Sequence, residues 1–111
     1  HYIKVNNLDF SSEANEGPGP VDFKVSRGQD CTVVELKLSS NDDYMHGYQD
    51  QIQQYAEAEG TENMVFILVD NGHKIRTNRL REQNQKDIRA GLLVPEVVIV
   101  DANTRLSASR R

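Results

Sequence analysis

Hydrophobic and polar residues alternate in three short segments in the first third of the chain. Residues 21–26 (VDFKVS) and 31–38 (CTVVELKL) each alternate with a period of two, which predicts two strands. The turn-forming residues 27–30 (RGQD) lie between them, so we expect the two strands to form an antiparallel hairpin. Residues 2–5 (YIKV) alternate in the same way and predict a further short strand.

A polar, turn-rich segment covers residues 6–20 and ends in Gly-Pro-Gly-Pro at residues 17–20. Repeated proline and glycine exclude a helix here, and the pattern predicts a loop that leads into a strand.

Helical spacing replaces alternation in the middle of the chain and predicts a helix over residues 43–59. Polar residues 39–42 supply candidate N-caps, and Gly60 ends the helix. The residues that recur at steps of three and four are Tyr44, Tyr48, Gln51, Ile52, Tyr55 and Ala56.

The last part of the chain predicts strand, helix and strand. Residues 64–69 (MVFILV) are continuously apolar, which is typical of a central strand buried on both faces. Residues 70–72 predict a turn, and residues 78–90 predict a weakly amphipathic helix that ends at Gly91. Residues 97–100 (VVIV) predict the last strand.

The resulting order is β-β-β-α-β-α-β, with a hairpin first and βαβ crossovers later. This order predicts a single α/β domain over residues 1–111, with a mixed sheet flanked by helices on both faces. A chain of 111 residues is long enough for one buried core and too short for two.

Composition and charge narrow the class of protein. Hydrophobic residues make up 37% and charged residues 27% of the chain, as in a globular domain. The single cysteine excludes an internal disulfide and a cysteine-based zinc site. The longest apolar run has six residues and no leader precedes it, so we expect a cytoplasmic protein without a membrane segment. Because the first residue is His1, we expect a fragment of a larger protein.

Net charge is distributed unevenly along the chain. Residues 1–73 hold 13 acidic and 4 basic residues, whereas residues 74–111 hold 9 basic and 4 acidic residues. A basic last third could bind a polyanion, although an ordinary mixed surface explains the charges equally well.

An acid and a base share one side of the second hairpin strand. Glu35 and Lys37 are two residues apart, so they project in the same direction, and pairing of the strands would bring Asp22 close to Glu35. Two neighbouring carboxylates favour a divalent cation such as Mg²⁺, and a lysine beside them can orient water or stabilise phosphate charge. The alternative is a solvated ion pair on an open sheet face.

Three motifs in order resemble the PD-(D/E)xK nuclease superfamily, which has the restriction-endonuclease-like fold. They are GPGPVDF at residues 17–23, ELK at residues 35–37 and QIQQY at residues 51–55. The last is similar to the QxxxY motif of the RecB-like branch, and the resemblance extends over residues 17–101. It implies a Mg²⁺-dependent deoxyribonuclease, with Mn²⁺ as a possible substitute, and leaves endonuclease and exonuclease action open.

The resemblance also implies a role for each matching residue. Asp22, Glu35 and the main-chain carbonyl of Leu36 would bind the metal. Lys37 would position the attacking water, Gln51 would lie near the phosphate and Tyr55 would support Gln51. On residues alone, Gln51 and Tyr55 could instead belong to a packing stripe of the helix.

We expect DNA as the main partner, together with other domains of a parent chain or a second copy. Four basic residues could follow a DNA backbone, with a solvated helix face as the alternative: Lys74, Arg76, Arg79 and Arg81. The competing interpretation of the whole chain is a catalytically inactive nuclease-fold module for nucleic-acid binding or assembly.

Overall fold

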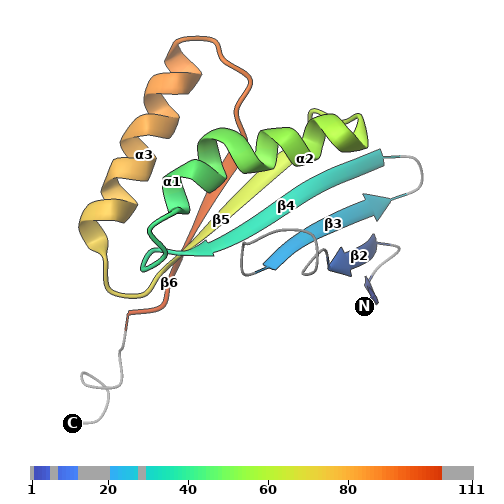
Figure 1. Ribbon diagram of the computed structural model, residues 1–111, viewed down its shortest axis with the longest axis horizontal. Coiled ribbons are helices and arrows are strands. Elements are labelled where there is room, and N and C mark those ends of the chain that lie inside the picture. The colour runs from blue at the N-terminus through green and yellow to red at the C-terminus, as the bar shows by residue number, and fades with distance from the viewer. Residues whose placement is uncertain (1, 6–7, 13–20, 28–29, 104–111) are drawn as a thin grey trace, which may run out of the picture.

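The computed structural model contains one six-stranded sheet with helices packed on it (Figure 1). It describes the backbone of residues 2–5, 8–12, 21–27 and 30–103, and side chains within residues 31–103. The strands lie across the sheet in chain order, and their bounds are β1 Tyr2–Val5, β2 Leu8–Ser12, β3 Val21–Arg27, β4 Asp30–Leu38, β5 Met64–Asp70 and β6 Glu96–Asp101.

Strands β1 to β4 form the antiparallel half of the sheet. The expected hairpin is confirmed, since β3 and β4 are neighbours and pair from Val21 opposite Leu36 to Arg27 opposite Asp30. Strand β2 corrects the expectation of a loop throughout residues 6–20. Its sequence LDFSS has only two apolar residues, so alternation alone is a weak signal there, and pairing with strands on both sides stabilises it.

Strands β4, β5 and β6 form the parallel half, joined by two helical crossovers. The first crossover consists of α1 Tyr44–His46, the π-helical segment η1 Gly47–Gln51 and α2 Ile52–Glu59. It ends at Gly60, whose φ of 71° is the left-handed conformation that glycine adopts easily. The second crossover is α3 Lys74–Arg89, which begins four residues earlier than the pattern predicted.

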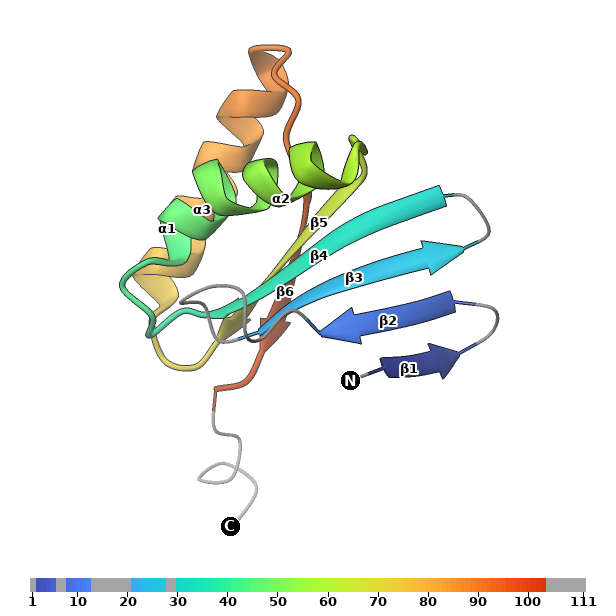
Figure 2. The same cartoon turned by 45° about the vertical axis from the view of Figure 1, so that its right-hand side comes forward.

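Both helical crossovers pack on the same face of the sheet, which corrects the expectation of helices on both faces (Figure 2). The reason is topological. The chain moves in one direction across the sheet, from β4 to β5 to β6, and a right-handed crossover in an unchanging direction always covers the same side. Helices on both faces would need a reversal of strand order.

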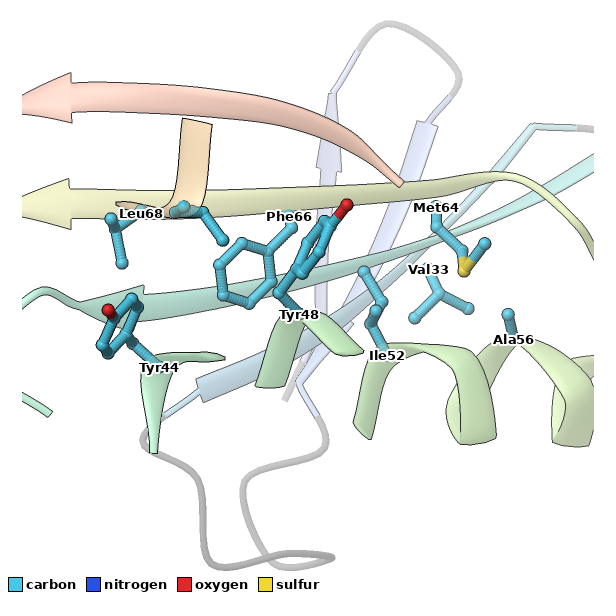
Figure 3. Packing of buried hydrophobic residues seen from close by; sticks show 9 residues of the cluster. Val33, Tyr44, Tyr48, Ile52, Ala56, Met64, Phe66 and Leu68 are labelled. Carbon is cyan, nitrogen blue, oxygen red and sulfur yellow. The ribbon is translucent and has the colours of Figure 1, made fainter. Parts of the chain in front are cut away.

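The core lies between this face of the sheet and the helices (Figure 3). Phe66 and Leu68 of β5 are fully buried, and Tyr48 and Ile52 pack on them from the first crossover. Leu80 of α3 belongs to the same cluster. Tyr48 and Phe66 meet edge to face, with ring centroids 6.0 Å apart.

No helix covers the opposite face of the parallel strands within the described part of the chain. The register aligns nine residues there in three rows, and eight of them are aliphatic. They are half-buried or exposed: Val34, Leu36, Leu38, Val65, Ile67, Val69, Glu96, Val98 and Val100.

Candidate active site

Glu35 and Lys37 lie on the helix-covered face of β4 and form an ion pair. Lys37 Nζ is 3.4 Å from Glu35 Oε2, and the two side chains are only 1% and 0% exposed. The alternative of a solvated ion pair on an open sheet face is therefore wrong for these side chains. Alternation showed that β4 has two faces, but the helices cover the face that carries the charges, and Leu36 and Leu38 face the other way.

Asp22 of β3 stands directly opposite Glu35 in the strand register. Directly opposed residues of an antiparallel pair share one face of the sheet, with Cβ atoms about 4.5–5.5 Å apart. The backbone thus brings together the two positions from which the sequence predicts metal-binding carboxylates. The side chain of Asp22 lies outside the described part, so the distance between the carboxylates stays a prediction.

Gln51 and Tyr55 are half-buried on the flank of the first crossover that faces β3. The opposite flank is fixed by Gln53, whose Nε2 donates a hydrogen bond of 3.1 Å to the carbonyl of Leu93, in the segment before β6. Gln51 lies about 200° away from Gln53 around the helix axis, at 3.6 residues per turn. Tyr55 follows Gln51 by four residues, so the two side chains share this flank, and Tyr55 also packs against the core. The position of Tyr55 therefore agrees both with support of Gln51 and with a packing role.

Gly47 lies against the ion pair and was missed by the sequence analysis. A Cβ built on Gly47 would be 2.9 Å from Lys37 Cε, 3.0 Å from Glu35 Oε2 and 3.2 Å from Phe66 Cε1. Glycine inside a helix costs about 1 kcal/mol relative to alanine, so a glycine there often marks a close approach. That signal was present in the sequence, inside the predicted helix 43–59.

A polar network joins the ends of β4 and β5 at the carboxyl edge of the parallel strands. Ser39 Oγ donates to Asn71 Oδ1 at 2.8 Å, and Asn71 Nδ2 donates to Ser40 Oγ at 3.0 Å. The serines therefore connect two loops instead of capping the following helix. Asp43 is the N-cap residue there and makes no side-chain capping bond.

Asp70 is a second buried acid, 2% exposed, at the end of β5. Its Oδ1 accepts hydrogen bonds of 3.1 Å from the main-chain N–H groups of Gly72 and His73. Burial alone would raise the pKa of the Asp70 carboxyl, but the bonds from Gly72, His73, Thr77 and Asn103 outweigh it and lower that pKa below its usual value. The two main-chain bonds close the turn that leads into α3, whose N-cap residue is His73.

Tyr48 fastens the first crossover to α3. Its hydroxyl donates to Asp87 Oδ2 at 2.9 Å and accepts from Asn84 Nδ2 at 3.1 Å. Burial raises the pKa of the Tyr48 phenol from 10.0 to about 12; the hydrogen bond from Asn84 opposes the shift, and Asp87 adds to it.

The four basic residues expected to meet DNA lie along α3 but have different surroundings. Arg76 donates to the Ser39 carbonyl at 2.9 Å and to Asp42 Oδ1 at 2.8 Å, and its guanidinium lies 5.6 Å from the Tyr44 ring centroid. Three of the four are exposed, namely Lys74, Arg79 and Arg81.

An open pocket of about 490 Å³ lies at the start of α3. Three of its six lining residues are basic, and Ile75, 74% exposed, lies among them. The lining residues are Gly72, His73, Lys74, Ile75, Arg76 and Arg79.

The donor set suits Mg²⁺, which needs only one or two carboxylates besides water and phosphate. Glu35 and the register position of Asp22 supply two. Among the residues that the structure describes, no three acidic, histidine or cysteine side chains gather as a metal site. Over the same residues, no helix is long and apolar enough to cross a membrane.

The fold and the site define a mixed α/β protein with an acid–lysine pair buried between sheet and helix. The chain belongs to the family described as Domain of unknown function (DUF8371), which matches residues 1–73. No curated protein and no solved structure matches the chain. The matched part contains every residue with an expected catalytic role, and the expected DNA-contacting residues begin directly after it.

Proposed function

We propose that this chain is a Mg²⁺-dependent deoxyribonuclease domain of the PD-(D/E)xK kind. The observation that carries the proposal is the register of the hairpin, which sets Asp22 opposite Glu35, with Lys37 ion-paired to Glu35 at 3.4 Å. The helix that follows carries Gln51 and Tyr55 on the flank nearest to β3. Asp22, Glu35 and Gln51 thus lie on β3, β4 and the first crossover, in the order that the superfamily resemblance implies.

Each residue has a specific part in the proposed hydrolysis. Asp22, Glu35 and the Leu36 carbonyl hold the cation, for which Mn²⁺ could substitute. The bound cation supplies Lewis-acid stabilisation of the phosphate charge. Lys37 orients the attacking water and donates to the developing charge. Gln51 contacts the phosphate, and Tyr55 supports Gln51.

The proposal requires a change in access to the site. Glu35 and Lys37 are buried, so a cation and a phosphate reach them only when the first crossover or its neighbours move away from β4. The half-buried flank of Gln51 and Tyr55 is the side from which a strand would enter.

The exposed cations Lys74, Arg79 and Arg81 would bind the DNA backbone, with Arg76 as a secondary contact because its guanidinium already holds Ser39 and Asp42. We further propose a cytoplasmic location, no membrane association, and action together with other domains of a parent chain or a second copy.

The test is cleavage of a supercoiled plasmid with Mg²⁺ and with EDTA. We expect Glu35→Gln and Lys37→Ala to lower the rate at least about 10²-fold, since each removes charge stabilisation, while DNA binding in Ca²⁺ persists. Asp70→Asn is the matched control, because it changes a buried acid of the adjacent strand that has no catalytic role. Cleavage by folded Lys37→Ala at the parental rate would exclude the proposal.

A second candidate is a catalytically inactive module that binds nucleic acid or assembles with a partner. The observation in its favour is the complete burial of Glu35 and Lys37, which suits an ion pair with a structural role. Salt-dependent DNA binding by a wild-type chain that cleaves neither with Mg²⁺ nor with Mn²⁺ would support this candidate.

A further inference from the structure

The first crossover approaches the sheet closely at Gly47. Its position is crowded by three side chains, with Lys37 Cε and Glu35 Oε2 nearest to where a Cβ would be. Gly47 opens the π-helical segment η1, a form that is rare and is often found at functional sites. The backbone of this turn therefore lies directly on the buried acid–lysine pair.

We propose that Gly47 is a positioning residue for the Glu35–Lys37 pair, and that its missing side chain keeps the Lys37 ammonium beside the Glu35 carboxylate. The part of this inference that concerns catalysis rests on the proposed nuclease function. The part that concerns the geometry of the pair does not.

Space, not backbone conformation, explains the glycine at this position. Gly47 has φ of −58° and ψ of −44°, an ordinary right-handed helical conformation open to any residue. Gly60 is the opposite case, because it has φ of 71° and nothing lies within 4 Å of where its Cβ would be. Glycine is thus explained by lack of space at residue 47 and by backbone conformation at residue 60.

An added methyl group at Gly47 would move Lys37 before it moved the sheet. Lys37 Cε is near the end of a flexible side chain, whereas Phe66 Cε1 belongs to a rigid buried ring. Since the lysine is enclosed, the displaced ammonium would leave its place 3.4 Å from Glu35. The expected defect is therefore in the geometry of the pair, in a protein that still folds.

The first experiment measures Gly47→Ala and Gly60→Ala together in plasmid cleavage. We expect Gly47→Ala to lower kcat at least about tenfold with little change in KM, as expected when transition-state groups are misplaced and substrate binding is intact. Gly60→Ala is strained by its positive φ and controls for lost stability, so it should keep the parental kcat while folded. Parental kcat in Gly47→Ala would overturn the inference.

The second experiment needs no activity and so separates this inference from the proposed function. Urea unfolding is compared for Gly47→Ala in the parent and in a Glu35→Gln, Lys37→Ala background. Helix propensity alone predicts an unfolding constant lowered about fivefold by alanine. We expect Gly47→Ala to raise the unfolding constant at least about tenfold in the parent. In the Glu35→Gln, Lys37→Ala background, where the contact with Lys37 Cε is gone, we expect no such rise. Equal changes in both would overturn the inference, even if the wild type cleaves DNA.

Discussion

Two neighbouring parallel strands each bury one carboxylate, and the two are held in different ways. Asp70 of β5 accepts main-chain N–H groups in the turn before α3, as well as the Thr77 hydroxyl and the Asn103 side chain. The exposed ammonium of Lys74 lies 4.0 Å from its other carboxylate oxygen. Glu35 of β4 has an ammonium on its own strand as its ion-pair partner, beneath a glycine of the next helix. Both side chains are at most 2% exposed.

The different partners of the two carboxylates distinguish an acid that supports the fold from one that suits a chemical role. The bonds to Asp70 close the turn before α3 and favour the charged carboxylate, so this acid has a structural explanation. A buried ion pair is weak evidence for stability, because desolvation of both ions offsets their attraction. Stability alone is thus a poor reason for burying Glu35 and Lys37 together, which agrees with their proposed catalytic role.

The largest expected effect comes from breaking the ion pair on one side. Lys37→Met leaves the Glu35 carboxylate buried without its ammonium and should lower the free energy of unfolding by about 3–5 kcal/mol. Glu35→Gln combined with Lys37→Met removes both charges and should cost much less. Urea denaturation measures both. A double variant as unstable as the single one would show that packing matters here and charge does not.

Asp70→Asn should cost about 2 kcal/mol at pH 7, since it replaces charged hydrogen bonds by neutral ones. Because the folded state lowers the pKa of Asp70, its stabilisation is fully present above the ordinary value of 3.8 and is lost as the pH falls through the lower folded value. Acid unfolding curves of the variant should lack this component. Glu62→Gln, at an exposed acid, controls for the loss of one negative charge.

Tyr48→Phe should cost about 1 kcal/mol, because it removes the hydroxyl between Asp87 and Asn84. The folded pKa of about 12 exceeds the ordinary 10.0, so the stabilisation is full below pH 10 and is lost as the pH rises through 12. Ultraviolet absorbance titration of the phenolate reports this ionisation. A phenolate that forms at the ordinary pKa would mean that α3 and η1 are not held together as described.

The smallest effect on stability is expected for the exposed cations of α3. Arg79→Ala and Arg81→Ala should each change the free energy of unfolding by less than about 0.5 kcal/mol. If they contact phosphate, each should lower the slope of log K against log salt by about 0.9. Arg76→Ala should behave differently and mainly destabilise the chain, because its guanidinium joins α3 to Ser39 and Asp42.

Alternation and helical spacing were sufficient to predict the element order of the parallel half and the β3–β4 hairpin. They could not show on which face the helices lie, because that depends on the direction in which the chain crosses the sheet. The π-helical turn at Gly47 was also invisible, since the steps of three and four run through it without a break.

The sequence brought Glu35 and Lys37 together correctly, but it could not show that both side chains are buried. Charged residues are usually exposed, and a local pattern cannot show that a backbone without a side chain will lie on top of them. Asp70 was interpreted only as part of a turn because its partners are main-chain groups. Arg76 looked like its exposed neighbours because its acceptors lie more than thirty residues earlier in the chain.

The π-helical segment also sets the rotational phase of the first crossover. One added residue in a helix turns everything after it by about 100° relative to what precedes it, at 3.6 residues per turn. A π-helical turn absorbs one extra residue, and Tyr44 before the segment and Ile52 after it are both buried in the core. One residue deleted from this segment would restore a regular helix with Gln51 and Tyr55 on the same flank, whereas one residue inserted in α2 before Tyr55 would turn Tyr55 by about 100°. The segment can therefore absorb a change of length that the regular helix after it cannot.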